Sequence, residues 1–175
     1  MNVAELDAEI GDARRAYIDT SACIAYHSTT ERAYPLARHL FGRIADNVDP
    51  LVGYMSIVSA SEMLVRPIRA GDHRLTLVTR FLRDFPNLYM VNADFEIALQ
   101  AANIRVLTRL ALADALIIGT AIMAGCEAIV TNDERWSRRV GPLVPPVLLD
   151  LPRALAARTG ANGAHPPLPV RPASA

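Results

Sequence analysis

Short apolar runs that alternate with helical patterns are the feature that most constrains the fold of this chain. Each run is rich in Val, Ile, Leu or Tyr, and most are followed by a segment with apolar residues at helical spacing. The expected strands are Arg15–Ile18, Leu51–Val58, Asn87–Val91, Ala128–Thr131 and Pro146–Leu149. This alternation predicts an α/β fold with a central, mainly parallel sheet of four to five strands and helices on both faces.

Helical segments are expected before the first strand and between the strands. Ile97, Ala101 and Ile104 should face inward from one of them, and Gly125 is a typical residue to end another. Pro67 is expected to kink or end the helix that carries Glu62. The expected helices are Val3–Arg14, the stretch TSACIAY after Asp19, Glu31–Ala45, a helix through Glu62, Asp72–Phe85, Asp94–Leu107, Ala113–Ala124 and a short helix or turn in ERWSRRVGPL.

The length of 175 residues favours one domain, because a chain of this size buries enough surface to fold without a metal or a disulfide. We expect that domain to span residues 15–151, after an N-terminal helical extension at 1–14. Residues 152–175 contain mostly Pro, Ala and Gly with few large apolar side chains. Such a composition predicts a flexible tail.

The charge balance does not by itself indicate a nucleic-acid binder, because 18 acidic residues offset 18 basic ones. All the basic residues are Arg, which a GC-rich genome explains and which also suits bidentate phosphate contacts. Cys23 and Cys126 lack the spacing of a metal site and are expected to be buried thiols. No run is long enough for a membrane span, so we expect a cytoplasmic protein with no membrane partner.

Four acidic residues fall where strands end or helices begin. Asp19 follows the first strand, Glu62 is expected in the first turn after the second, Asp114 opens a helix, and Asp133 ends a strand. The carboxyl ends of parallel strands meet at one edge of a sheet, where ligands bind. Four carboxylates at that edge would repel each other strongly unless a cation lay among them.

Each of these acids also has a purely structural explanation. Ser59 and Glu62 fit a capping box, in which the glutamate only bonds the helix start. Asp114 could cap its helix or interact with the helix dipole, and Asp19 could cap the helix after the first strand. Asp133 fits an Asx turn. Four independent caps in this order are less expected than a shared site.

The strings YIDTSACIAY, SASEML, LADALIIGTAIMAG and VTND, in this order, resemble the PIN-domain nuclease family, and most closely its VapC-like toxin ribonucleases. The resemblance covers Arg15–Leu151. It implies a homodimeric Mg²⁺- or Mn²⁺-dependent endoribonuclease, the toxin of a toxin–antitoxin pair, that hydrolyses RNA and is inhibited by a cognate antitoxin protein. The residues that would bind the metal and carry out catalysis are Asp19, Glu62, Asp114 and Asp133. Many members have another acid two residues after the last one, where this chain has Arg135.

Within that resemblance, the side chains can be given different roles. Mg²⁺ takes few carboxylates directly and keeps several waters, so Asp19 and Asp114 are expected as direct ligands, with Glu62 and Asp133 acting partly through water. The residues expected to orient these carboxylates by hydrogen bonds are Thr20, Ser21, Thr131 and Asn132. The family's paired helices after the second strand often bind RNA. Here they carry a run of arginines that solvated helix faces explain about as well: Arg66, Arg69, Arg74, Arg80 and Arg83.

Two other classes of protein compete with the nuclease hypothesis. A phosphatase of the haloacid-dehalogenase type would use Asp19 as nucleophile, but such enzymes need a second Asp where this chain has Ser21. A catalytically weak PIN-like module that binds RNA or a partner is the alternative that Arg135 favours. Glycine-rich nucleotide-binding fingerprints are absent from the sequence.

Overall fold

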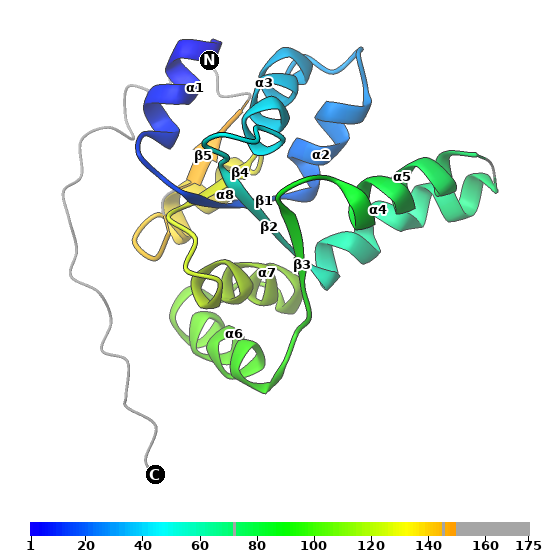
Figure 1. Cartoon of the computed structure of the whole chain (residues 1–175). Helices are drawn as coiled ribbons and strands as arrows, with labels where there is room; N and C mark the ends of the chain where they lie inside the picture. The colour runs from blue at the N-terminus through cyan, green and yellow to red at the C-terminus, as the bar shows by residue number, and fades with distance from the viewer. Residues whose placement is uncertain (72, 145, 150–175) are drawn as a thin grey trace.

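The computed structural model describes residues 1–71, 73–144 and 146–149 (Figure 1). The predicted tail at 152–175 lies outside the described residues. In chain order the elements are α1 Val3–Ile10, β1 Arg15–Ile18, α2 Thr20–His27, α3 Tyr34–Ile44, β2 Val52–Ser56, α4 Ile57–Ala70, α5 Arg74–Asp84, β3 Leu88–Val91, α6 Phe95–Thr108, α7 Leu112–Met123, β4 Ala128–Thr131, α8 Glu134–Arg139 and β5 Pro146–Leu148.

The sheet is parallel throughout, with its five strands in the order β3-β2-β1-β4-β5. β1 lies at the centre, where Tyr17 pairs with Tyr54 of β2 and with Ile129 of β4. The predicted α/β fold with a parallel sheet is therefore confirmed. Because every strand runs the same way, β1, β2 and β4 all end at one edge of the sheet.

Side chains along the central strands alternate between two cores. Ile18 and Val130 belong to one hydrophobic cluster, whereas Tyr17 and Ile129 belong to the other. Residues of α1 to α5 fill the first cluster, and residues of α6, α7 and α8 fill the second. Figure 1 shows α6 and α7 together on one side of the sheet, opposite α1, α2 and α3. Helices thus cover both faces, as the sequence predicts.

Strand β2 is shorter than predicted, because a serine starts the next helix early. The Ser56 hydroxyl accepts a 3.1 Å hydrogen bond from the backbone N–H of Ser59 and caps α4. Glu62 consequently lies in the second turn of α4, so the predicted first-turn position is wrong. The Ser59 hydroxyl lies 2.8 Å from the Tyr17 hydroxyl, and the cap of α4 is Ser56, so the Ser59–Glu62 capping box is not the start of this helix.

Pro67 was expected to kink or end α4, and the structure shows that it does not end it. The helix continues to Ala70, and its end is set by Gly71, which adopts the left-handed conformation at φ 62°. The Gly71 N–H donates to the carbonyl of Pro67 at 3.1 Å, which closes the last turn. α4 and α5 form a hairpin that projects from the body of the molecule (Figure 1).

Aromatic rings tie α2, α3 and α5 together beneath this hairpin. Tyr26 stacks against Phe41 with ring centroids 4.5 Å apart, and Phe81 lies 5.0 Å from Phe85. Phe41 and Phe81 are almost fully buried. Such pairs contribute about 0.5–1.5 kcal/mol each beyond the area they bury. The aromatic cluster therefore anchors the base of the hairpin to the main core.

Helices α6 and α7 cross closely at Gly119. A Cβ added there would lie 3.3 Å from the carbonyl oxygen of Ile97 and 3.4 Å from the amide nitrogen of Ala101, both on α6. As predicted, Ile97, Ala101 and Ile104 are buried.

Within the described residues, no single helix is both long and apolar enough to span a membrane; α6 and α7 meet that test only as a pair, with a bend of 118° between them.

Candidate active site

The four acidic residues singled out in the sequence line one open pocket. It has a volume of about 510 Å³ and lies at the sheet edge where β1 and β4 end. α2, α4, α7 and the β4–α8 connection each contribute to its wall. The lining residues are Asp19, Thr20, Ser21, Ile24, Glu62, Asp114, Ile117, Asn132, Asp133, Arg135 and Trp136. The expectation that distant acids come together at one edge of the sheet is thus met in the structure.

Asp19 is the most enclosed of the four, with only 8% of its surface exposed. Its backbone N–H donates to Val130 of β4, which continues the strand pairing. Its Oδ2 accepts hydrogen bonds from the hydroxyls of Ser21 at 2.7 Å and Thr131 at 2.9 Å. The same carboxylate caps α2 through a longer bond from the Ser21 N–H. Asp19 directly follows β1, and its contacts with β4 and α2 therefore fix its position.

Two of the hydroxyls expected to orient the carboxylates, those of Ser21 and Thr131, are linked through Asp19, and that of Thr20 bonds Glu62 separately. Ser21 Oγ accepts from the backbone N–H of Asn132 at 2.9 Å, and Thr131 Oγ1 accepts from the N–H of Asp133 at 3.0 Å. Thr20 Oγ1 donates to Glu62 Oε2 at 3.2 Å, which links α2 to α4. The turn after β4 is thereby held against the start of α2.

Burial and neighbouring charges both shift the pKa values of Glu62 on α4 and Asp114 on α7. Burial raises the pKa of Glu62 most, and the charges of Asp19 and Asp114 raise it further, while the Thr20 hydrogen bond lowers it. Burial also raises the pKa of Asp114 most, with contributions from Asp133 and Asp19. The repulsion between these carboxylates is a smaller contribution than burial, and a bound cation would relieve it.

Asp133 differs from the other acids because the guanidinium group of Arg135 forms an ion pair with it. Arg135 Nε donates to Oδ1 at 2.9 Å and to Oδ2 at 3.0 Å, and its Nη2 also bonds Oδ2. These bonds lower the pKa of Asp133, chiefly through the side-chain hydrogen bond. The charge of Arg135 also lowers the pKa of Asp114, against the effect of burial. Asp133 is therefore held ionised.

The capping explanation holds for two of the acids, and the helix-dipole explanation is consistent with the position of a third, Asp114. Asp19 caps α2, and Asp133 caps α8 by accepting from the Arg135 N–H at 2.9 Å. Asp114 lies in the first turn of α7, whose N-cap is Ala111 with no side-chain hydrogen bond. Capping therefore accounts for Asp19 and Asp133 only in part, and it does not account for Glu62 or Asp114 facing the same pocket.

The donor set fits a hard divalent cation. Its oxygen atoms come from carboxylates, hydroxyls and an amide, the ligands that Mg²⁺ and Mn²⁺ prefer. Across the described residues, no group of three or more His, Cys, Asp or Glu side chains is placed so that it could hold a metal ion. Because Mg²⁺ keeps several of its waters and is usually bound through one or two carboxylates, it would not need three protein ligands here. Which carboxylates are direct ligands stays a prediction.

Sequence reasoning missed the apolar part of the pocket. Ile24 and Ile117 line it beside the acids, and Trp136 closes it from α8. A helical signal was available, since Ile24 follows Ser21 by three positions and Ile117 follows Asp114 by three. Trp136 follows Asp133 by three as well, on a helix too short for a periodic pattern. These side chains give the carboxylates a partly dehydrated wall.

The model of the family described as "PIN domain" matches residues 16–141, which is most of the chain. The chain therefore belongs to the PIN-domain family. Its fold is that of VapC-type toxins, as comparison with solved structures shows. Among curated protein sequences, none matches this chain.

Several of those solved structures cover nearly the whole length of the other chain. DNA-bound VapBC from Salmonella typhimurium aligns with a TM-score of 0.57 and 22% identity over 78% of this chain and 98% of that chain. The Mycobacterium tuberculosis VapC20, described as a sarcin–ricin loop cleaving toxin, gives 0.57 and 17% over 71% and 95%. A Klebsiella pneumoniae toxin–antitoxin complex gives 0.56 and 18% over 77% and 98%. At these identities the similarity establishes the fold.

Proposed function

We propose that this chain is a divalent-metal-dependent endoribonuclease and the toxin of a type II toxin–antitoxin pair. The observation that carries the proposal is the pocket in which Asp19, Glu62, Asp114 and Asp133 meet at one sheet edge. Membership of the PIN-domain family supports it, because the acids fall within the matched residues. All four are hard oxygen donors, as Mg²⁺ or Mn²⁺ requires.

Some residues of the pocket would bind the divalent cation, and others would orient the carboxylates that bind it. A divalent cation, when bound, supplies hydroxide near neutral pH and offsets the charge of the phosphate. Asp19 and Asp114 would hold it directly, and Glu62 and Asp133 would act partly through water. Thr131 and the other hydroxyls that bond these acids keep their oxygens aimed at the pocket.

RNA cleavage by the purified protein tests the proposal. With Mn²⁺ or Mg²⁺ present, wild type should cut structured RNA, and a sarcin–ricin loop hairpin is a suitable first probe given the description of the M. tuberculosis protein. Asp19→Ala and Asp114→Asn should each lose at least about 100-fold in rate. Asp12→Asn, an exposed acid outside the pocket, is the matched control and should cut normally. Equal cutting by all four proteins would refute the proposal.

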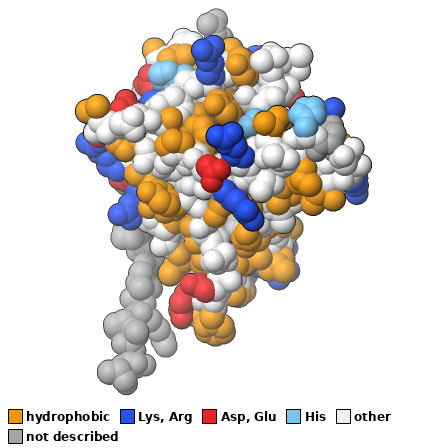
Figure 2. All heavy atoms as spheres, turned by 45° about the vertical axis from the view of Figure 1, so that its right-hand side comes forward, with side chains coloured by type: hydrophobic (Ala, Val, Ile, Leu, Met, Phe, Trp, Pro, Cys, Tyr) orange, Lys and Arg blue, Asp and Glu red, His pale blue; other side chains and the backbone are white. Residues whose placement is uncertain are grey.

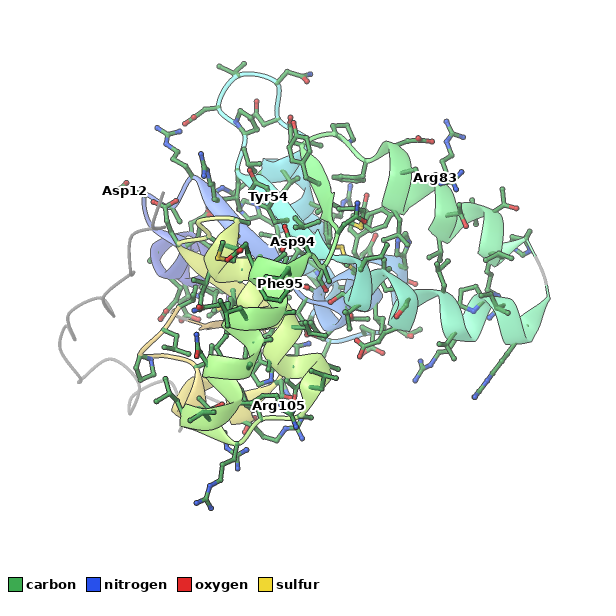
Figure 3. All side chains as sticks on the ribbon, turned by 90° about the horizontal axis from the view of Figure 1, so that it is seen from below. Asp12, Tyr54, Arg83, Asp94, Phe95 and Arg105 are labelled. Carbon is green, nitrogen blue, oxygen red and sulfur yellow. The ribbon has the colours of Figure 1, made fainter. Side chains whose placement is uncertain are left out.

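The RNA would reach the pocket over the α4–α5 hairpin. The arginines there are all exposed: Arg66, Arg69, Arg74, Arg80 and Arg83. Figure 3 shows Arg83 pointing away from the body of the molecule, and Figure 2 shows arginine side chains standing among hydrophobic ones on the side of the hairpin. Phosphate contacts of this kind make binding salt-dependent, so affinity for RNA should fall steeply as salt rises.

A cognate antitoxin and a second copy of the chain complete the proposed assembly. The Klebsiella and Salmonella structures contain toxin–antitoxin complexes, which supports looking for a small antitoxin encoded beside this chain. Co-expression should yield a stable complex with no nuclease activity.

We infer a cytoplasmic location, since Cys23 and Cys126 are unpaired and buried, as is usual in a reducing compartment.

A catalytically weak PIN-like module that binds RNA or a partner is the second candidate. The contact between Arg135 and Asp133 favours it, because that guanidinium occupies oxygens that a metal would use. Calorimetry separates the two functions. The nuclease should bind Mn²⁺ in a manner that depends on Asp114, whereas an inert module should show no such binding.

A further inference from the structure

The side chain of Arg135 and the carboxylate of Asp133 form a closed pair at one side of the pocket, called here the Asp133–Arg135 fork. Arg135 Nε contacts both carboxylate oxygens at 2.9 and 3.0 Å, and Nη2 adds a contact to Oδ2. The backbone N–H of Arg135 donates to Oδ1 as well, at 2.9 Å. One residue thus occupies both oxygens of Asp133 through its side chain and its backbone.

The fork is held by local geometry, which distinguishes it from an ordinary surface ion pair. Asp133 is fixed from both sides, because its own N–H donates to Thr131 and its carboxylate caps α8. Its side chain is 21% exposed, against 75% for Arg135. Exposed ion pairs are weak when two long side chains must be ordered. Here the acid is already ordered and the two residues are only two positions apart.

The charge of the pocket suggests what the fork does. Four carboxylates and one guanidinium line it, which gives a formal charge of minus three. One divalent cation would bring that charge to minus one. A second divalent cation would leave an excess positive charge and would have to displace or approach the guanidinium of Arg135, at a cost in repulsion. The lining therefore suits one ion.

We propose that Arg135 takes the place of a second metal ion, so that the pocket binds a single divalent cation on the side of Asp19, Glu62 and Asp114. This inference rests on the proposed metal-dependent function and adds the number of ions and the residue that sets it. Arg135 is not a ligand in this scheme. It acts through Asp133, whose oxygens it engages so that Asp133 meets the ion only through water, and it supplies a permanent positive charge at the pocket wall.

The number of Mn²⁺ ions bound, measured by calorimetry on the full chain, tests this inference without a cleavage assay. Wild type should bind one Mn²⁺ per chain. Arg135→Gln removes the charge at similar size and should bind the first ion several-fold more tightly or gain a second. Arg135→Asp introduces an acid at this position and should bind two ions. Arg135→Lys keeps the charge without the planar fork and serves as the control, with one ion bound.

The outcomes separate this inference from the proposed function. Two ions bound by wild type would overturn the single-ion inference and leave metal dependence intact. One ion bound with the same affinity by wild type, Arg135→Gln and Arg135→Asp would also overturn it. Absence of Mn²⁺ binding to wild type would overturn the proposed function together with the inference. Circular dichroism should show that each variant is folded, and Arg135→Gln preserves the test if Arg135→Asp does not fold.

Discussion

The hydroxyl of Thr131 on β4 donates a 2.9 Å hydrogen bond to Oδ2 of Asp19 at the end of β1, and both residues are buried. The same hydroxyl accepts from the backbone N–H of Asp133 at 3.0 Å. One side chain therefore positions two of the four acids of the pocket. The bond joins neighbouring strands at their carboxyl ends, where the adjacent positions of β1 and β4 are in register.

Replacing Thr131 should therefore damage stability and the site together. Thr131→Val keeps the shape but removes the hydroxyl, which leaves Asp19 with one donor fewer and the Asp133 N–H unpaired. We expect a loss of about 1–3 kcal/mol in the free energy of unfolding, measured with urea. Thr131→Ser retains the hydroxyl and should recover most of that loss. A Val variant as stable as wild type beside a destabilised Ser variant would show that packing of the methyl group matters instead.

The packing of α7, which carries Asp114, gives a second prediction. Gly119→Ala would place a methyl group 3.3 Å from the Ile97 carbonyl, so α6 and α7 would have to move apart. We expect the free energy of unfolding to fall by about 1–3 kcal/mol. Gly42→Ala in α3 is the control, since nothing lies within 4 Å of its added Cβ. That control should be stabilised by up to about 1 kcal/mol through helix propensity. A neutral Gly119→Ala variant would contradict the close crossing.

Glu127 gives a prediction on pH. Its Oε2 accepts from the backbone N–H groups of Arg14 at 2.7 Å and Arg15 at 3.0 Å, and these bonds lower its pKa below the usual 4.5. A lowered pKa means that the charged form stabilises the fold above pH 4.5 and that this contribution disappears as pH falls through the lowered pKa. Because the carboxylate is exposed, we expect only about 1 kcal/mol.

Chemical unfolding of wild type and Glu127→Gln between pH 7 and pH 3 measures this contribution. The amide keeps an acceptor at the same place and removes only the charge. Wild type should be the more stable protein at pH 7, and the difference should shrink as pH falls below 4.5. A difference that stays constant over this range would show that the charge of Glu127 is not its source.

Metal binding should stabilise the fold through the pocket acids. A ligand present at about 100 times its Kd adds about 2.7 kcal/mol to the free energy of unfolding. Mn²⁺ should therefore raise the melting temperature of wild type by several degrees, and this increase should largely vanish in Asp114→Asn. Asp12→Asn should respond like wild type. An equal increase in Asp114→Asn would mean that the ion binds elsewhere.

The sequence predicts the parts of this molecule that depend on local pattern. The strands Arg15–Ile18 and Ala128–Thr131 have the expected bounds, and Gly125 adopts a positive φ of 65° just after α7. Both follow from residue type and spacing along a short segment. The grouping of Asp19, Glu62, Asp114 and Asp133 was also predictable, because parallel strands end at a common edge.

Features that depend on contacts distant in sequence were not predictable. Ser56, whose side chain caps α4, is also held by Tyr17, which lies 39 positions earlier and accepts a hydrogen bond from the Ser56 N–H. Pro67 was expected to kink or end its helix, yet α4 continues past this buried residue to Ala70 and ends at the left-handed Gly71. The Asp133–Arg135 fork is a local contact, but it also required coordinates, because the sequence does not give the conformation of the Arg135 side chain.

A structure of crystals soaked in Mn²⁺, with the anomalous signal of manganese recorded, tests most directly whether the gathered acids form a metal site. We predict one anomalous peak in the pocket, within coordination distance of oxygens of Asp19 and Asp114, and no peak against the Asp133–Arg135 fork. A pocket without manganese, or manganese bound only at acids outside it, would contradict the account.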